Sequence, residues 1–448
     1  MTSERSQTAR ERTPRAEKAG AKIEEHRLAN GLTVILAARH LDPVVAVMLW
    51  YKVGARDEEE REAGVSHFLE HMMFKGSRRF GKGEIDRITT TLGGSNNAFT
   101  TADHTAYWFE FASDRWEKAL EIEADRMRQL LLDPAEFAAE KAVVLEELAM
   151  GDDDPWRTLT QQLQLVLFAR HPYRRPVIGF PDALQALDVA AMRSYYERHY
   201  HPGNAALVVC GDIEPKAALA LVRKHFESIP AGAPRNAPYR PPMSEPKGEQ
   251  RVQIAWDDRG ARLVMAWPTA LVGTDEDYAF DIVSTVLTGG RTSRLHRRLV
   301  LEQGLATSIS SHNDTRLDAG VFWIFAECAQ GVAPQKLEAA IDREIARVSK
   351  ELVPAKELDR SKRILLSSEA YDNETVSDLA EEIGEFAADA HWKLALEAPD
   401  RIRNTTAPSV RDVCARLLRS ERRVVGWCLP RAAAPRRAKK RRRSKGSA

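Results

Sequence analysis

A proline-rich segment near the middle of the chain divides the sequence into two stretches with the same order of elements. Residues 230–248 hold six prolines and show no helical or strand periodicity, which is typical of a linker. The stretch RLVMAWPTALVGTDEDYAFDIVSTVL after this segment follows the pattern strand, acidic turn, helix, as VVAVMLWYKVGARDEEEREAGVSHFL does before it. Segments of the type helix then strand also align near the two ends, with few identical residues. The sequence therefore predicts a duplicated domain.

The length and composition of the chain agree with two domains. The chain has 448 residues, which is more than one domain with a single hydrophobic core usually contains. Its composition, with 43% apolar and 29% charged residues, is typical of a globular protein. We expect a disordered leader over 1–22, a first domain over 23–229, the linker over 230–248, a second domain over 249–430 and a basic disordered tail over 431–448.

The basic tail carries an unusual share of the positive charge. It holds nine Lys or Arg residues and no acid, and without it the formal net charge changes from +1 to −8. This composition is typical of a solvated, disordered appendage. Contact with nucleic acid or another acidic surface is the alternative. Because the chain lacks interleaved aromatic residues and any folded binding motif for nucleic acid, we do not expect a nucleic-acid partner.

Three further features concern the compartment. No run of 18 apolar residues occurs, so we expect no membrane-spanning helix and no membrane partner. The first twenty residues are polar and basic, unlike a secretory signal peptide. The four cysteines lie far apart and form no C-x-x-C pair, which favours free thiols in a reducing compartment. Together these features predict a cytoplasmic protein, with the periplasm as the alternative if the start is misassigned.

The segment from His67 to His71 reads H-x-x-E-H, the reverse of the common zinc-protease signature H-E-x-x-H. Residues four apart share one face of a helix, so the two imidazoles can approach one ion. Two histidines at this spacing are also common as ordinary surface or core residues. Here the flanking residues are apolar and predict a buried helix, where unpartnered imidazoles and a carboxylate would be costly. A metal would remove that cost, and Glu70 would then stand beside a zinc-activated water.

A catalytic zinc ion usually takes three protein ligands, so a third must come from elsewhere in the chain. The best segment is 136–155, where one stripe of a predicted helix holds Glu140, Val143, Val144 and Glu147. We expect both valines to pack inward and to lead Glu147 toward the interior. Glu146 points about a hundred degrees away. The alternative is an amphipathic surface helix that is rich in glutamate.

With Glu147 placed 76 residues after His71, the chain resembles the pitrilysin/insulinase family of inverted-motif zinc peptidases. The segments that carry this resemblance are GVSHFLEHMMFKGS, LGGSNNAFTTADHTAYWFEF, EKAVVLEELAMGDDDP, HPYRRPVIGF, YYERHYHPGNAALVVCGDI and GGRTSRLHRRLVLEQGLA. They cover roughly residues 23–430 and are similar to the bacterial and mitochondrial-processing-peptidase branch. The resemblance implies an α+β fold of two similar domains, each a mainly antiparallel sheet flanked by helices. The second domain lacks H-x-x-E-H and would be non-catalytic.

By position, the resemblance also implies roles for single residues. His67, His71 and Glu147 would bind one Zn²⁺ per chain, and Glu70 would be the general base of a metalloendopeptidase or oligopeptidase. Glu140 matches an acidic residue that supports the metal site.

The resemblance further implies how a substrate binds. Asn97 and Ala98 match residues before an edge strand that pairs with an extended peptide substrate, a form of β-augmentation.

One segment departs from the family pattern. Active members usually carry an Arg and a Tyr seven residues apart in the second half, where this chain has Val300 and Thr307. Neither side chain offers a cation or a phenol hydroxyl. We therefore expect a heterodimer in which a homologous subunit supplies the Arg/Tyr pair. A homodimer is the alternative for assembly, and a non-catalytic structural or binding subunit is the alternative for function.

Overall fold

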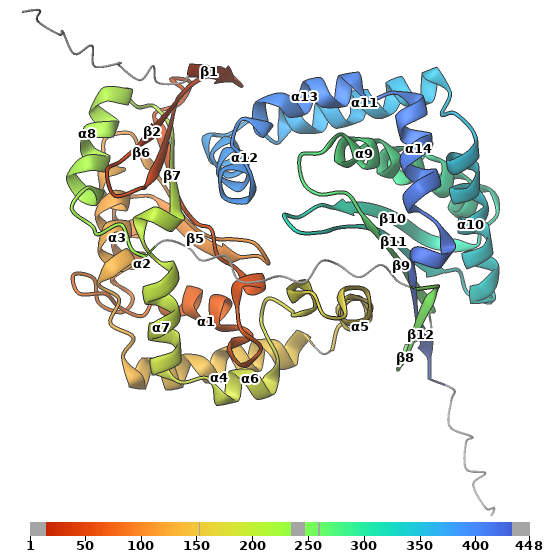
Figure 1. The fold of residues 1–448 in the computed structure, drawn as a ribbon, viewed down its shortest axis with the longest axis horizontal. Helices are drawn as coiled ribbons and strands as arrows, with labels where there is room; N and C mark the ends of the chain where they lie inside the picture. The colour runs from red at the N-terminus through yellow and green to blue at the C-terminus, as the bar shows by residue number, and fades with distance from the viewer. Residues whose placement is uncertain (1–14, 152, 234–246, 259, 432–448) are drawn as a thin grey trace, which may run out of the picture.

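The computed structural model describes residues 15–151, 153–233, 247–258 and 260–431, and within them the chain forms two lobes, each built on one sheet (Figure 1). The first sheet runs in the order β1-β2-β3-β7-β4-β6-β5 and the second in the order β8-β12-β9-β11-β10. The first comprises β1 (Arg15–Lys18), β2 (Ala21–Arg27), β3 (Thr33–Ala38), β4 (Val44–Tyr51), β5 (Ser95–Thr100), β6 (Thr105–Ala112) and β7 (Ala205–Gly211). The second comprises β8 (Gln250–Trp256), β9 (Arg262–Thr269), β10 (Ala306–Asp314), β11 (Gly320–Cys328) and β12 (Val424–Pro430).

The two sheets share one topology, which confirms the predicted α+β fold of two similar domains. In the first, β3 and β7 are parallel and the other neighbouring pairs are antiparallel. In the second, β8 and β12 are parallel and the other pairs are antiparallel. Each strand of β8-β12-β9-β11-β10 therefore has a counterpart in β3-β7-β4-β6-β5.

Helices flank both sheets. Those before the linker are α1 (Val65–Met72), α2 (Glu84–Thr91), α3 (Glu117–Arg128), α4 (Pro134–Gly151), α5 (Pro155–Phe168), α6 (Pro181–Ala186), α7 (Val189–His199) and α8 (Pro215–Phe226). Those after it are α9 (Asp275–Thr288), α10 (Pro334–Lys350), α11 (Ala355–Tyr371), α12 (Val376–Asp389), α13 (Leu394–Asn404) and α14 (Ala407–Leu417). Short helical turns complete the chain at η1 (Ala55–Asp57), η2 (Glu60–Glu62), η3 (Pro172–Arg174), η4 (Pro202–Asn204), the π-helical η5 (His296–Glu302) and η6 (Ser420–Arg422).

Each sheet is buried on both faces, and its central strands are apolar at nearly every position. In β4, Val47 and Leu49 join the core under α1 and α3, whereas Met48 and Trp50 point to the opposite face. Successive strand residues face opposite sides of a sheet, so an unbroken apolar run is the pattern of a strand covered twice.

The second cover of each sheet comes from the other half of the chain. Helix α12 packs on β4 and β7 of the first sheet, and α5 packs on β12, β9 and β8 of the second. Glycine permits both close approaches. A Cβ on Gly384 of α12 would lie 2.0 Å from Trp50 Nε1, and one on Gly426 of β12 would lie 2.2 Å from Leu163 Cδ1 of α5. The linker thus separates the sheets in sequence, while the exchanged helices join them in space.

The structure describes part of the predicted leader but little of the predicted linker. Residues 15–22 form β1 and the start of β2, so the prediction of a disordered leader is wrong for them. Lys18 explains the order, because its Nζ bonds Glu369, Glu382 and the Ala395 carbonyl oxygen of the other half. Residues 1–14, most of the 230–248 linker and the tail from 432 lie outside the described residues.

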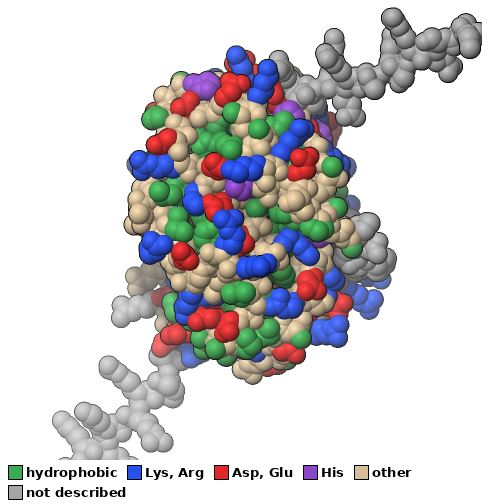
Figure 2. All heavy atoms as spheres, turned by 90° about the vertical axis from the view of Figure 1, so that its left-hand side faces the viewer, with side chains coloured by type: hydrophobic (Ala, Val, Ile, Leu, Met, Phe, Trp, Pro, Cys, Tyr) green, Lys and Arg blue, Asp and Glu red, His purple; other side chains and the backbone are tan. Residues whose placement is uncertain are grey.

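Two observations concern the surface charge and the membrane-spanning potential of the described chain. On the outer face of the first lobe, basic and acidic side chains are interspersed (Figure 2). Within the described part of the chain, none of the helices has the length and apolar character needed to cross a bilayer.

Candidate metal centre

Two helices bring together three side chains that can ligate a metal. His67 and His71 project from α1, and Glu147 projects from α4, which packs against α1. One potential ligand atom from each lies within 4.8 Å of the others. Glu147 Oε1 is 3.8 Å from His67 Nε2, and Glu147 Oε2 is 3.7 Å from His71 Nε2. Two imidazole nitrogens and a carboxylate are the ligand set of many catalytic zinc sites.

The start of α1 is fixed by a buried carboxylate. Glu58 accepts hydrogen bonds from the backbone N–H groups of Gly64 and Ser66, both at 2.9 Å. The first N–H groups of a helix have no partner within the helix, so a carboxylate there also meets the positive end of the helix dipole. Burial raises the pKa of Glu58 to about 7, although these N–H bonds act to lower it. Glu58 therefore anchors the helix turn that carries His67.

Glu140 orients one of the two imidazoles. Its Oε1 is 2.9 Å from His71 Nδ1, and its Oε2 is 2.5 Å from Lys75 Nζ. Burial raises the pKa of Glu140, but the hydrogen bonds from Lys75 and His71 outweigh it, and the net pKa is lowered. An ionised carboxylate can only accept, so Nδ1 of His71 donates to Glu140, and Nε2 is the nitrogen that faces Glu147.

The electrostatic surroundings keep the other imidazole neutral. Burial, followed by the nearby His71, lowers the pKa of His67 to about 4, with a smaller contribution from Arg157, while Glu147 acts in the opposite direction. A neutral imidazole is the form that binds a metal. His67 Nδ1 is buried without a hydrogen-bond partner among the described residues.

Glu70 lies beside this group and contacts the edge of the first sheet. Thr100 Oγ1 donates a hydrogen bond of 2.6 Å to Glu70 Oε2. Burial raises the pKa of Glu70, while the bond from Thr100 acts in the opposite direction. Thr100 is the last residue of β5, so the carboxylate is held between the motif helix and that strand.

The stripe predicted on α4 is partly different in the structure. Val144 is fully buried and Glu140 nearly so, but Val143 is 48% exposed, so the prediction that both valines pack inward is wrong. The buried face runs through Phe137, Glu140 and Val144, and Val143 lies about 100° from Val144 around the helix. Glu147 still follows this face, and Glu146 is exposed as expected.

Asn97 and Ala98 lie in β5, the outermost strand of the first sheet. Asn97 is paired with Trp108 of β6, and Ala98 with Tyr107, while the other edge of β5 has no neighbouring strand among the described residues. Asn97 is exposed, and Ala98 packs partly against the core.

Val300 and Thr307 lie away from the metal group. Val300 packs against the core of the second lobe, and the exposed Thr307 donates a hydrogen bond of 3.1 Å to Glu327 Oε2. Neither lines the cavity that contains His67 and Glu147.

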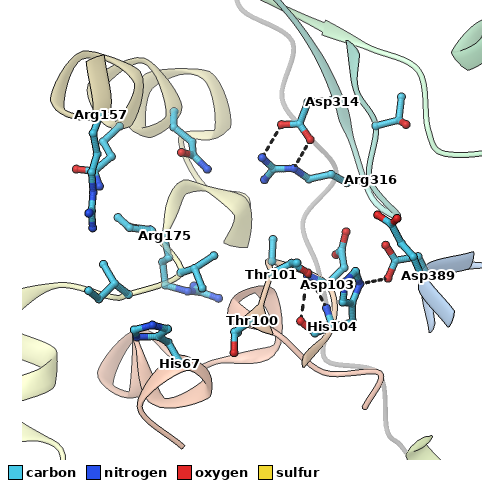
Figure 3. A pocket seen from close by; sticks show the side chains of 18 of the residues that line it. His67, Thr100, Thr101, Asp103, His104, Arg157, Arg175, Asp314, Arg316 and Asp389 are labelled. Atoms are coloured by element: carbon cyan, nitrogen blue, oxygen red, sulfur yellow. Dashed lines mark hydrogen bonds and ion pairs between the residues drawn. The ribbon is translucent and has the colours of Figure 1, made fainter. Parts of the chain in front are cut away.

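That cavity, of about 560 Å³, is lined from both halves of the chain (Figure 3). The first half contributes His67, residues 100–104, Glu147, Arg157, Gln161, Gln164 and residues 175–178, and the second half contributes residues 314–316, Glu385 and Asp389. His104 joins the two halves through a bond of 2.7 Å from Nδ1 to Asp389 Oδ1. Because β5 ends at this wall, an extended chain along that strand would lead toward the metal group.

Comparison with known proteins places the chain in a family. The profile described as Insulinase (Peptidase family M16) matches residues 33–180, and the profile described as Peptidase M16 inactive domain matches residues 186–365. Together they cover well over half of the chain. The chain belongs to the pitrilysin/insulinase family. The "inactive domain" profile begins within the first half and continues into the second, and the residues that it matches contain no H-x-x-E-H.

Several members of this family are similar to the chain over most of their length. An uncharacterized zinc protease from Mycobacterium leprae is 32% identical over 68% of this chain and 68% of its own. The zinc protease PqqE from Helicobacter pylori is 31% identical over 80% of this chain and 82% of its own. A crystal structure of a protease from Helicobacter pylori is 26% identical, with a TM-score of 0.87 over 92% of this chain and 100% of its own. The first two of these relatives bear the name of zinc proteases.

Some contacts of the metal centre were not predicted from the sequence. Lys75 lies four residues after His71, a spacing that could have indicated its shared face, but its ion pair with Glu140 depends on how α1 and α4 pack. Thr100 and Arg157 come from other elements, and no periodicity points to either.

Proposed function

We propose that this chain is a zinc-dependent endopeptidase or oligopeptidase in which His67, His71 and Glu147 bind one Zn²⁺. The observation that carries this proposal is the convergence of these three side chains within 4.8 Å, beside the half-buried Glu70. The donor set fits zinc, because two imidazole nitrogens and one carboxylate oxygen are ligands that zinc takes in catalytic sites. Zinc in such a site acts as a Lewis acid and lowers the pKa of water.

Glu70 is the general base in this proposal. Its carboxylate takes a proton from the attacking water and later delivers it to the departing amine of the cleaved peptide. The raised pKa favours this exchange, because a base whose pKa lies nearer the working pH both accepts and returns a proton readily. The bond from Thr100 holds one oxygen of Glu70 and leaves the other to exchange the proton.

Glu140 positions His71, and β5 positions the substrate. The free edge of β5 offers backbone N–H and C=O groups to an extended peptide, with Asn97 and Ala98 in its central part. Such pairing is independent of side chains and would suit a peptidase that acts on unfolded segments.

We further propose that a homologous subunit completes the active site as a heterodimer. Support comes from Val300, which is packed in the second lobe, and Thr307, which is bonded to Glu327, so neither can act as a donor near Glu147. Co-expression with a related chain that carries the Arg/Tyr pair should raise turnover. Unchanged turnover in the mixed complex would leave a homodimer. The cytoplasmic location stays a prediction.

Zinc content and peptide cleavage test the peptidase proposal together. The purified chain, alone and with its partner, should contain about one zinc per chain and cleave internally quenched peptides. Stoichiometric zinc without cleavage across a broad peptide library would favour the alternative, a non-catalytic structural or binding subunit.

A further inference from the structure

We propose that Arg157 is a specificity-determining residue that binds a carboxylate group of the peptide substrate beside the metal centre. This inference rests on the proposed peptidase function and adds a substrate class to it. The carboxylate can be the C-terminus of the peptide or an acidic side chain, since both present the same planar pair of oxygens.

The position of Arg157 places a guanidinium close to the metal group. Arg157 lies in the first turn of α5 and lines the same cavity as His67 and Glu147. Its side chain extends from α5 toward the side of the cavity where His67 lies (Figure 3).

The guanidinium rests on the end of α4. A Cβ added to Gly151 would lie 2.2 Å from Arg157 Nη1 and 2.3 Å from its Cζ. Gly151 is one helical turn, about 6 Å, beyond Glu147. A side chain at position 151 would displace the guanidinium, so Arg157 packs against the last turn of α4, near the predicted third ligand.

Among the arginines that line this cavity, Arg157 differs in its partners. Arg175 donates from Nη2 to the carbonyl oxygens of residues 55, 56 and 58, and Arg316 is held by both oxygens of Asp314. These two guanidinium groups serve the fold. Arg157 is half-buried and makes no hydrogen bond or ion pair with another described residue. No described residue therefore occupies its donors, which can bind a ligand in the cavity.

Electrostatics favour an anionic ligand at this place. A guanidinium and a divalent cation repel one another unless negative charge lies near both, and Glu147, which lines the same cavity, is one such charge. A carboxylate of the substrate would supply the second negative charge. Arginine binds a carboxylate through two parallel N–H bonds, which a lysine ammonium cannot reproduce.

Binding to the metal-free protein tests this inference without turnover. The probes are fluorophore-labelled hexapeptides rich in alanine. One has a free C-terminus, one is amidated, and two further amidated peptides carry one internal Glu or one internal Gln. We expect the wild-type chain to bind at least one carboxylate-bearing peptide about 10- to 100-fold more tightly than its neutral counterpart. The R157Q variant should lose this preference.

Three variants make the result specific. R157K should keep only part of the preference, because the charge remains and the fork is lost. R170Q removes the same charge from an exposed residue that does not line the cavity, and should bind like wild type. Far-ultraviolet circular dichroism would show that all variants fold. A wild-type chain that binds charged and neutral peptides equally, or an R157Q chain that keeps the preference, overturns the inference.

The zinc-loaded protein separates this inference from the proposed function. If the loaded chain cleaves no peptide while the Arg157-dependent preference persists, the peptidase proposal fails and the carboxylate site stands. If cleavage occurs with the same preference in wild type and R157Q, the peptidase proposal stands and the carboxylate site fails.

Discussion

The replacement of Glu140 by alanine should weaken zinc binding without removing a ligand. Glu140 Oε1 bonds His71 Nδ1 at 2.9 Å and its Oε2 bonds Lys75 at 2.5 Å, in a position that is only 7% exposed. Glu140→Ala releases the imidazole from its fixed tautomer and orientation, and it leaves the Lys75 ammonium without its carboxylate partner. Both changes act against a cation at this site.

The expected size follows from those contacts. A hydrogen bond between a charged carboxylate and an imidazole N–H contributes about 1.5–3 kcal/mol, and outer contacts of metal ligands typically change affinity by about 10- to 100-fold. We therefore expect the zinc Kd of Glu140→Ala to rise by about 10- to 100-fold. Glu140→Gln keeps an oxygen that accepts from Nδ1 but loses the charge, so its Kd should rise by less than about tenfold.

Competition with a chromophoric zinc chelator at pH 7.5 measures these affinities. The matched control is Glu146→Ala, which removes an exposed carboxylate from the same helix. A Glu140→Ala protein with a zinc Kd within about twofold of wild type, or equal losses in Glu140→Ala and Glu146→Ala, would refute the role assigned to Glu140.

Three further changes probe other parts of the molecule. Glu70→Gln should keep stoichiometric zinc, as measured by elemental analysis. Its kcat should fall by at least about 100-fold because the general base is lost. A near-normal kcat would exclude Glu70 as the base. Burial, followed by the charge of Asp277, raises the pKa of Asp281 from 3.8 to about 7. The folded chain thus binds that proton more tightly than the unfolded chain, and stability declines as pH rises from 4 to 7 by up to about 1.4 kcal/mol per pH unit. Asp281→Asn should flatten this decline in urea unfolding measured from pH 4 to 8, and curves parallel to wild type would contradict the assignment. Gly384→Ala should lower the free energy of unfolding by about 1–3 kcal/mol, because the new Cβ would lie 2.0 Å from the ring of the buried Trp50. An unchanged midpoint in urea unfolding would contradict this prediction and show that α12 can shift on the sheet.

Much of the candidate site could be predicted because its main parts are local. His67 and His71 are four residues apart, so helical geometry alone sets them on one face. The prediction of Glu147 required both the periodicity of a second helix and the family resemblance. In the structure its carboxylate lies close to both imidazoles. Thr100 and Arg157 could not be predicted, since each reaches the site only through the packing of distant elements.

The fold shows the same division between local and distant effects. The linker and the repeated order of elements predicted two similar domains, and the matching strand orders confirm them. The ordered strand at Arg15–Lys18 was missed, because its polar sequence resembles a leader and its order depends on Lys18 meeting Glu369 and Glu382 far along the chain.

Apart from the strand at Arg15–Lys18, the sequence by itself determined where the main helices and strands form, which faces are apolar, and which residue types can bind a metal. Only the tertiary structure decided which apolar face covers which sheet. Leu159 and Leu163 of α5 show a clear apolar stripe, as do Leu379 and Ile383 of α12, yet each stripe packs on the sheet of the opposite half. The hydrophobic effect is non-directional. An apolar stripe on a helix therefore indicates that the stripe will be buried, but it does not indicate which sheet will cover it. The exchange of these two helices brings Arg157 and Asp389 to the walls of the cavity beside the metal centre.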